Sequence, residues 1–262
     1  MRFAILVTIL ALTFAQRLFA ADPLRIAIYA DAGAMEPYIT KAADAATSAG
    51  MAVSRVTAQD IVEGVLSAQD AIVFPGGTGG GLARSLGAAA SPIVREFVAG
   101  GGGVIGICAG GYLLSDGYSE DTNRLELINA GRWDSDNWAR GEGFVEIQPT
   151  GSDEAKPLRI RFENAPVFVP SKKGLDLPPY VSLATFRTDL TGEHVNRESI
   201  IGKDAIIAAP YGKGRVVLFG PHPELTPGLE HHYQNALRWV AGEGDGEVSW
   251  RSVLGSEKAG TN

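Results

Sequence analysis

The stretch from Gly101 to Leu114, GGGVIGICAGGYLL, places the only cysteine of the chain directly after an apolar run. Short apolar runs bounded by glycines are typical of buried parallel strands. The frame around Cys108 has the form Gly-x-Cys-x-Gly, which permits the sharp strand-to-helix turn that lifts a nucleophile above a sheet. A helix N-terminus there would favour the thiolate. Free cysteines are also common as small buried apolar residues, so it is the position that points to a nucleophile.

Other segments repeat the pattern of an apolar run that ends in glycine or proline. Residues 24–30 (LRIAIYA), 51–56 (MAVSRV), 70–81 (DAIVFPGGTGGG) and 214–224 (GRVVLFGPHPE) read as further strands, with a helix over 37–49 closed by Gly50. Between 124 and 211 the runs are shorter and alternate, which favours antiparallel strands, and residues 210–219 favour a hairpin. The sequence therefore predicts an α/β fold: a mostly parallel sheet with helices on both faces and an antiparallel strand insertion.

The N-terminal segment suits an export signal. Arg2 precedes an apolar run that is too short to span a bilayer, and small residues precede Asp22. We expect a signal peptide over 1–20, a mature start near Ala21 or Asp22, one domain over 21–242, and a polar, flexible tail over 243–262. The expected location is periplasmic or secreted. Because no cysteine directly follows the run, a lipid anchor is not expected, and the mature protein should have no membrane attachment.

The charge of the chain narrows its partners. Its 23 basic and 30 acidic residues give a net charge of −7, with no run of Lys or Arg. Removal of residues 1–20 would make it more acidic still. We therefore expect no nucleic-acid partner. The sequence leaves the oligomeric state open.

A thiolate nucleophile needs a general acid/base, usually a histidine held by a third group. Of four histidines, His194 lies in a polar stretch, and His231 and His232 open a helical segment where a surface or capping role is expected. His222 follows an apolar strand and stands between two prolines, and Glu224 can point the same way two residues on. Cys108, His222 and Glu224 are the candidate triad.

The glycines of residues 75–81 expose backbone N–H groups, which an acyl-transfer enzyme needs to hold an oxyanion. Gly77 and the amide of Ala109 are the candidate donors. A nucleotide-binding loop is the alternative interpretation, but the run lacks the Lys-Ser/Thr ending of a P-loop. A merely flexible turn is the third interpretation.

The motifs FPGG, GICAGG and PHPE, in this order, resemble the class I glutamine amidotransferase-like fold, a flavodoxin-like architecture with a Cys-His-Glu triad. The longer stretches around them, with ARGEGFVEI and FENAPVF, resemble the family named for the N-terminal domain of biotin-protein ligase. This resemblance covers roughly residues 24–240. The resemblance implies the fold and the catalytic residues. We expect no cofactor and no metal.

One departure bears on the substrate. Glutaminases of this fold usually carry Gln four residues after the nucleophile, where this chain has Tyr112. There is also no synthetase domain to receive ammonia, and no biotin-ligase catalytic region. We therefore expect poor hydrolysis of glutamine. Tyr112, Arg140 and Asn164 are candidate pocket residues, although for each of them a structural role is favoured over contact with substrate.

Two classes of function remain. The first is an exported cysteine hydrolase that acts on an amide bond of a small molecule or peptide-like substrate through a covalent thioester. The second is a non-catalytic protein that uses the same cleft to bind a small ligand or partner. The presence of all three triad residues favours the hydrolase.

Overall fold

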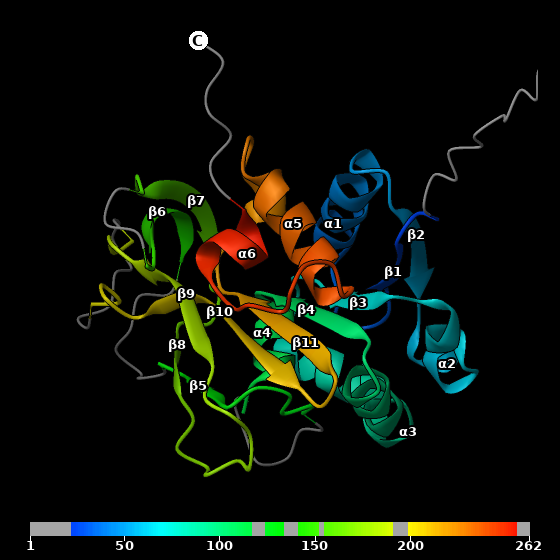
Figure 1. The fold of residues 1–262 in the computed structure, drawn as a ribbon. Coiled ribbons are helices and arrows are strands. Elements are labelled where there is room, and N and C mark those ends of the chain that lie inside the picture. The colour runs from blue at the N-terminus through cyan, green and yellow to red at the C-terminus, as the bar shows by residue number, and fades with distance from the viewer. Residues whose placement is uncertain (1–21, 117–123, 134–140, 152–154, 191–198, 256–262) are drawn as a thin grey trace, which may run out of the picture.

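The computed structural model describes residues 22–116, 124–133, 141–151, 155–190 and 199–255. One continuous sheet runs through them, in the order β2-β1-β3-β4-β11-β10-β9-β6-β7 (Figure 1). Its first half consists of β2 (Ala52–Val56), β1 (Arg25–Tyr29), β3 (Ala71–Phe74), β4 (Gly103–Ile107) and β11 (Gly214–Phe219). Neighbours in this half pair in parallel, and β4 lies between β3 and β11. The predicted parallel sheet is confirmed.

The second half of the sheet is antiparallel. It consists of β10 (Asp204–Tyr211), β9 (Val181–Phe186), β6 (Glu142–Pro149) and β7 (Leu158–Glu163). Two short strands, β5 (Ala130–Arg132) and β8 (Phe168–Pro170), pair with each other, and β8 also pairs with β10. The hairpin between β10 and β11 turns at Gly212, where φ is +58°. These strands form the predicted antiparallel insertion.

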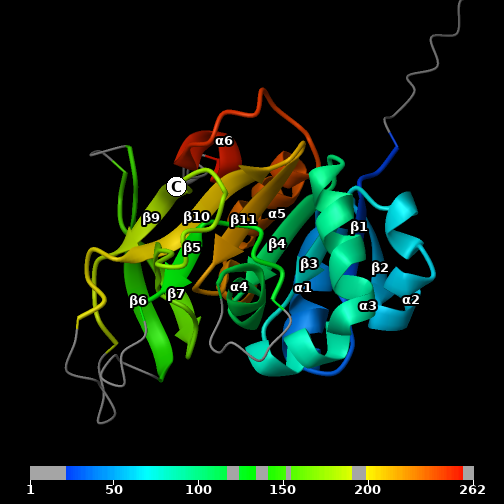
Figure 2. The ribbon, with the colours of Figure 1, turned by 90° about the horizontal axis from the view of Figure 1, so that it is seen from below.

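Helices cover both faces of the sheet, as Figures 1 and 2 show. On one face lie α1 (Glu36–Ser48), which has a proline in its first turn, and α5 (Glu230–Val240). On the other lie α3 (Gly79–Ala99) and α4 (Ala109–Leu114), with α2 (Ala58–Val62) and the 3₁₀ turn η1 (Val65–Ala68). Successive residues of the parallel strands point to opposite faces of the sheet and belong to two separate apolar cores. In β1, Ile26 and Ile28 pack toward α1 and α5, whereas Ala27 and Tyr29 pack toward α3.

The prediction of a flexible tail over residues 243–262 is wrong for part of that range. Residues 250–254 form α6 (Trp250–Leu254), which begins with a capping box at Ser249. Trp250, Val253 and Leu254 are buried, and the helix packs against α5. The glycine-rich stretch from 242 hides the apolar spacing of this short helix. Burial of the apolar side chains of α6 extends the core beyond residue 242.

No helix within the described residues is long and apolar enough to cross a membrane. The expected signal peptide, residues 1–20, lies outside the described part of the chain, which begins at residue 22.

Candidate active site

Cys108 occupies the turn between β4 and α4. Its backbone angles, φ +52° and ψ −105°, lie outside the regions that side-chain-bearing residues normally adopt. Such strain persists where the surroundings enforce it, and it is typical of functional positions. At Gly110, a Cβ atom would lie 2.0 Å from the carbonyl oxygen of Phe74. The small-residue frame is thus needed because α4 begins directly against strand β3.

His222 and Glu224 follow β11, the strand next to β4, so the parallel pairing brings both turns to the same edge of the sheet. His222 precedes the 3₁₀ turn η2 (Pro223–Leu225). Its backbone N–H donates to the carbonyl oxygen of Arg161 at 2.8 Å, which anchors the turn to β7. Nδ1 of His222 lies 2.6 Å from Oε1 of Glu224, and both side chains are fully buried. The carboxylate therefore fixes one edge of the imidazole.

The electrostatics of His222 favour the charged imidazolium. Burial lowers the pKa of His222, but the negative charge of Glu224 and a hydrogen-bonding interaction with Cys108 raise it, to about 10 overall. Because Nδ1 faces Glu224, Nε2 is the nitrogen left for the thiol. Within the described residues Nε2 makes no hydrogen bond of ordinary geometry, so its contact with Cys108 is loose. Catalytic hydrogen bonds are often loose before substrate binds.

The thiol itself is covered. Cys108 is 6 % exposed, and its Sγ donates a hydrogen bond to the backbone carbonyl oxygen of Glu163 at 3.4 Å. The nucleophile candidate is therefore enclosed by the end of β7 as well as by the sheet edge.

The two candidate oxyanion donors lie in suitable backbone. Gly77 has φ +152° and pairs with Ala34 in an isolated antiparallel bridge. The two backbone hydrogen bonds of this bridge are made by the residues on either side of the pair, so the N–H of Gly77 takes no part in them. A Cβ at Gly77 would lie 2.0 Å from the carbonyl oxygen of Gly33. Ala109 is the first residue of α4, so its N–H has no acceptor within the helix.

Two of the three candidate pocket residues meet. Tyr112 is buried on α4, and its hydroxyl donates to the backbone carbonyl oxygen of Asn164 at 3.5 Å. Asn164 follows β7 directly and has φ +49°. Arg140 lies outside the described residues, as does His194.

Sequence reasoning missed a second polar group beside His222. The ring of Tyr38, on α1, stacks on the imidazole with centroids 5.1 Å apart and planes 26° apart. The Tyr38 hydroxyl donates to Oε2 of Glu163 at 2.5 Å, and Nε of Arg161 donates to Oε1 at 2.5 Å. Glu163 and Arg161 stand two apart in one strand, a spacing that puts them on the same face, but nothing local links either to a tyrosine on a distant helix.

The remaining described histidines are structural. His231 binds the carbonyl oxygen of Gly228 through Nδ1. His232 is buried rather than on the surface, contacts Trp250 and binds the carbonyl oxygen of Leu254, and burial lowers its pKa to about 4. It therefore holds α6 against α5 as a neutral residue.

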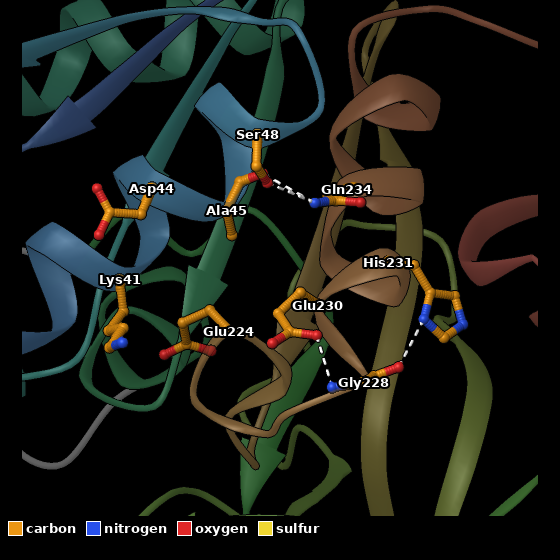
Figure 3. A pocket seen from close by; sticks show the side chains of 9 residues that line it. All are labelled: Lys41, Asp44, Ala45, Ser48, Glu224, Gly228, Glu230, His231 and Gln234. Atoms are coloured by element: carbon orange, nitrogen blue, oxygen red, sulfur yellow. Dashed lines mark hydrogen bonds between the residues drawn. The ribbon is translucent and has the colours of Figure 1, made fainter.

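A groove of about 470 Å³ lies between α1 and α5 (Figure 3). Lys41, Asp44 and Ser48 line it from α1, and Glu230, His231 and Gln234 line it from the facing helix. Glu224 lies at its floor, but because the side chain is fully buried the groove does not open onto the carboxylate. In the described part of the chain, no cluster of three or more His, Cys, Asp or Glu side chains could hold a metal ion.

Comparison with known proteins agrees with the fold that positions these residues. Residues 24–131 match the family model described as the N-terminal part of biotin-protein ligase. A solved glutamine amidotransferase is 20 % identical, with a TM-score of 0.56 over 83 % of this chain and 98 % of that one. A cytoplasmic protein from Salmonella typhimurium LT2 is 15 % identical, with a TM-score of 0.55 over 83 % of this chain and 99 % of that one. PurLQS from Thermotoga maritima is 16 % identical, with a TM-score of 0.52 over 84 % of this chain and 92 % of that one.

No curated protein matches the chain significantly. The solved structures are too distant in sequence to carry more than the fold. The chain thus has the glutamine amidotransferase-like fold, and the match to the biotin-protein ligase N-terminal family covers the part of it that carries Cys108.

Proposed function

We propose that this chain is a cysteine-dependent hydrolase of C–N amide bonds, with Cys108 as nucleophile, His222 as proton shuttle and Glu224 as its orienting group. The observation that carries the proposal is the combination of a strained backbone at Cys108 with a buried imidazole–carboxylate pair at 2.6 Å beside it. A protein that only binds a ligand has no need of that combination.

The proposed reaction proceeds in two stages. The Cys108 thiolate attacks the amide carbonyl carbon, and the N–H groups of Gly77 and Ala109 stabilise the oxyanion. The C–N bond then breaks as the His222 imidazolium donates its proton to the leaving amine, which leaves a thioester on Cys108. A water molecule, deprotonated by His222, attacks the thioester and releases the carboxylic acid and the thiol. The net change is hydrolysis of one amide by one water molecule.

The substrate class in this proposal is a small-molecule or peptide-like amide, met outside the cytoplasm. The apolar N-terminal run and the small residues before Asp22 support export. Intact-mass measurement of protein recovered from the periplasm tests this part: a mass that begins at Ala21 or Asp22 supports it, and retention of residues 1–20 contradicts it.

The catalytic part is tested with a panel of primary and secondary amides, following amine release and the mass of the protein under acid quench. Turnover with transient acylation of Cys108 is the expected result, abolished in Cys108→Ala and strongly reduced in His222→Ala. His231→Ala is the matched control, because this histidine lies in the groove and outside the proposed machinery. Turnover that persists in Cys108→Ala would contradict the assignment.

A non-catalytic ligand-binding protein is the second candidate. The observation that favours it is the covered thiol, which is 6 % exposed and hydrogen-bonded to Glu163. Under this alternative, Cys108 alkylates no faster than an ordinary thiol at neutral pH, and His222→Ala leaves that rate unchanged. Fast alkylation that depends on His222 rules the alternative out.

A further inference from the structure

The imidazole of His222 is held by two different kinds of contact. Glu224 binds Nδ1 in the plane of the ring at 2.6 Å, whereas Tyr38 stacks on its face with centroids 5.1 Å apart. A single hydrogen bond at one edge leaves the ring free to tilt about that bond. A stacked aromatic ring removes this freedom, because tilting would break the contact between the two faces.

Tyr38 is itself fixed on two sides. Its ring lies against Gly76, where a Cβ atom would stand 2.7 Å from the ring Cγ. Its hydroxyl donates to Glu163 at 2.5 Å, and Arg161 holds the other carboxylate oxygen. Burial, together with the charge of Glu163, raises the pKa of Tyr38, so the hydroxyl keeps the proton that it donates.

The strand that carries Glu163 also contacts both reacting groups. The carbonyl oxygen of Arg161 accepts from the His222 N–H, and the carbonyl oxygen of Glu163 accepts from the thiol of Cys108. The Tyr38 ring is therefore held by the same short segment of β7 that contacts Cys108 and His222. Displacement of Tyr38 would change the relation of the imidazole to the thiol without touching either residue.

We propose that Tyr38, anchored by Glu163, is a positioning residue that keeps Nε2 of His222 directed at the Cys108 thiol. This role rests on the proposed function, in which His222 exchanges a proton with Cys108. Charged or titratable groups face the imidazole from four elements: Glu224 from η2, Cys108 from the elbow, Glu163 from β7 and Tyr38 from α1. Tyr38 is the member that can act by shape without carrying a charge.

The test is the rate of Cys108 alkylation by iodoacetamide between pH 5 and 10, measured on the full chain. Tyr38→Leu removes the ring, and its alkylation rate below pH 8 should fall about two- to tenfold, the range expected for loss of one aromatic stack. Tyr38→Phe keeps the ring but loses the hydroxyl that Glu163 binds, so its alkylation rate, like that of Glu163→Ala, should lie between the rates of wild type and Tyr38→Leu. The shape of the pH profile is the readout that a purely structural role of Tyr38 would leave unchanged.

Arg161 forms ion pairs with two carboxylates, those of Glu163 and Glu142, and these two residues provide a matched pair of variants. Glu163→Ala removes the anchor of Tyr38 and should slow alkylation. Glu142→Ala removes a carboxylate 3.3 Å from the same guanidinium, on a side chain that is 60 % exposed, and should not. Equal effects of the two variants would mean that charge near Arg161, and not the position of Tyr38, sets the rate.

The outcomes separate this proposal from the function on which it rests. Alkylation in Tyr38→Leu at or above the wild-type rate, or equal slowing in Tyr38→Leu and Tyr38→Phe, overturns the positioning role. If His222→Ala also alkylates at the wild-type rate, the proposed function itself fails. Slow alkylation in His222→Ala together with an unaffected Tyr38→Leu leaves the function standing and removes only Tyr38.

Discussion

The thiol of Cys108 and the backbone carbonyl of Glu163 are joined by a hydrogen bond, with Sγ and the oxygen 3.4 Å apart. Glu163 belongs to the antiparallel half of the sheet and Cys108 to the parallel half. The candidate site therefore lies at the junction of the two halves, and in the proposed reaction the thiol gives up this hydrogen bond when it becomes a thiolate. The next residue, Asn164, sets the direction in which the chain leaves that carbonyl.

Asn164 should be sensitive to its backbone conformation. It has φ +49°, a region that asparagine and glycine tolerate and other residues adopt only at a cost. We expect Asn164→Ala to lower the free energy of unfolding by about 1 kcal/mol, and Asn164→Gly to stay within about 0.5 kcal/mol of wild type. Urea denaturation measures both. Equal stability of Asn164→Ala and wild type would mean that the backbone relaxes there.

Gly77 should not accept a side chain. The Cβ of Gly77→Ala would lie 2.0 Å from a backbone oxygen, so the glycine loop must move, and we expect a loss of more than about 2 kcal/mol of stability. The proposed amide hydrolysis by Cys108 should fall together with the stability. Gly50→Ala is the control: φ there is +80° but no atom lies within 4 Å, so only about 1 kcal/mol of backbone strain is expected. Similar losses in both variants would show that crowding at Gly77 is relieved cheaply.

The buried His222–Glu224 pair should make stability depend on pH. The pKa of His222 is raised from 6.5 to about 10 in the folded protein, so the folded state holds a proton that the unfolded state releases above pH 6.5. Its stabilisation is complete below pH 6.5 and is lost as pH rises through about 10, with a slope of at most about 1.4 kcal/mol per pH unit.

Glu224→Gln tests the cause of this dependence. The amide removes the negative charge that raises the pKa of His222, so the fall in stability between pH 7 and 9 should flatten. Urea denaturation at several pH values gives the slopes, and an unchanged slope in Glu224→Gln argues against a charged His222.

The hydroxyl of Tyr233 is a buried polar group with an unusual environment for its kind. It is fully buried on α5, and within the described residues its oxygen has no hydrogen-bond partner. Tyr233→Phe should therefore leave the free energy of unfolding unchanged or raise it by up to about 1 kcal/mol. Tyr29→Phe is the matched control, because that hydroxyl donates to Ser85 at 2.8 Å and its loss should cost about 1 kcal/mol. A destabilised Tyr233→Phe would reveal a partner for the hydroxyl.

The sequence indicated the fold well because local patterns and the chain order agree in the parallel half. Each strand there is a continuous apolar run with a glycine or proline behind it, and adjacent parallel strands must end at one edge. That reasoning brought Cys108 and His222 to neighbouring strand ends, where the structure has them. Tyr38 could not be found this way, because its contact with Glu163 joins residues 125 positions apart and depends on how α1 packs over the edge.

The remaining prediction concerns glutamine, which we expect to be hydrolysed slowly or not at all. Tyr112 stands where glutaminases of this fold carry Gln, and its hydroxyl is already bound to the carbonyl oxygen of Asn164 at 3.5 Å. The bulky ring therefore fills space near the nucleophile and offers no amide. A polar substrate group left unpaired there costs about 1–3 kcal/mol, and a displacement of about 1 Å can cost a further hundredfold in rate. Glutamate release by the purified protein measures this, with Cys108→Ala as the blank. Efficient release that Cys108→Ala abolishes would show that Tyr112 does not exclude glutamine.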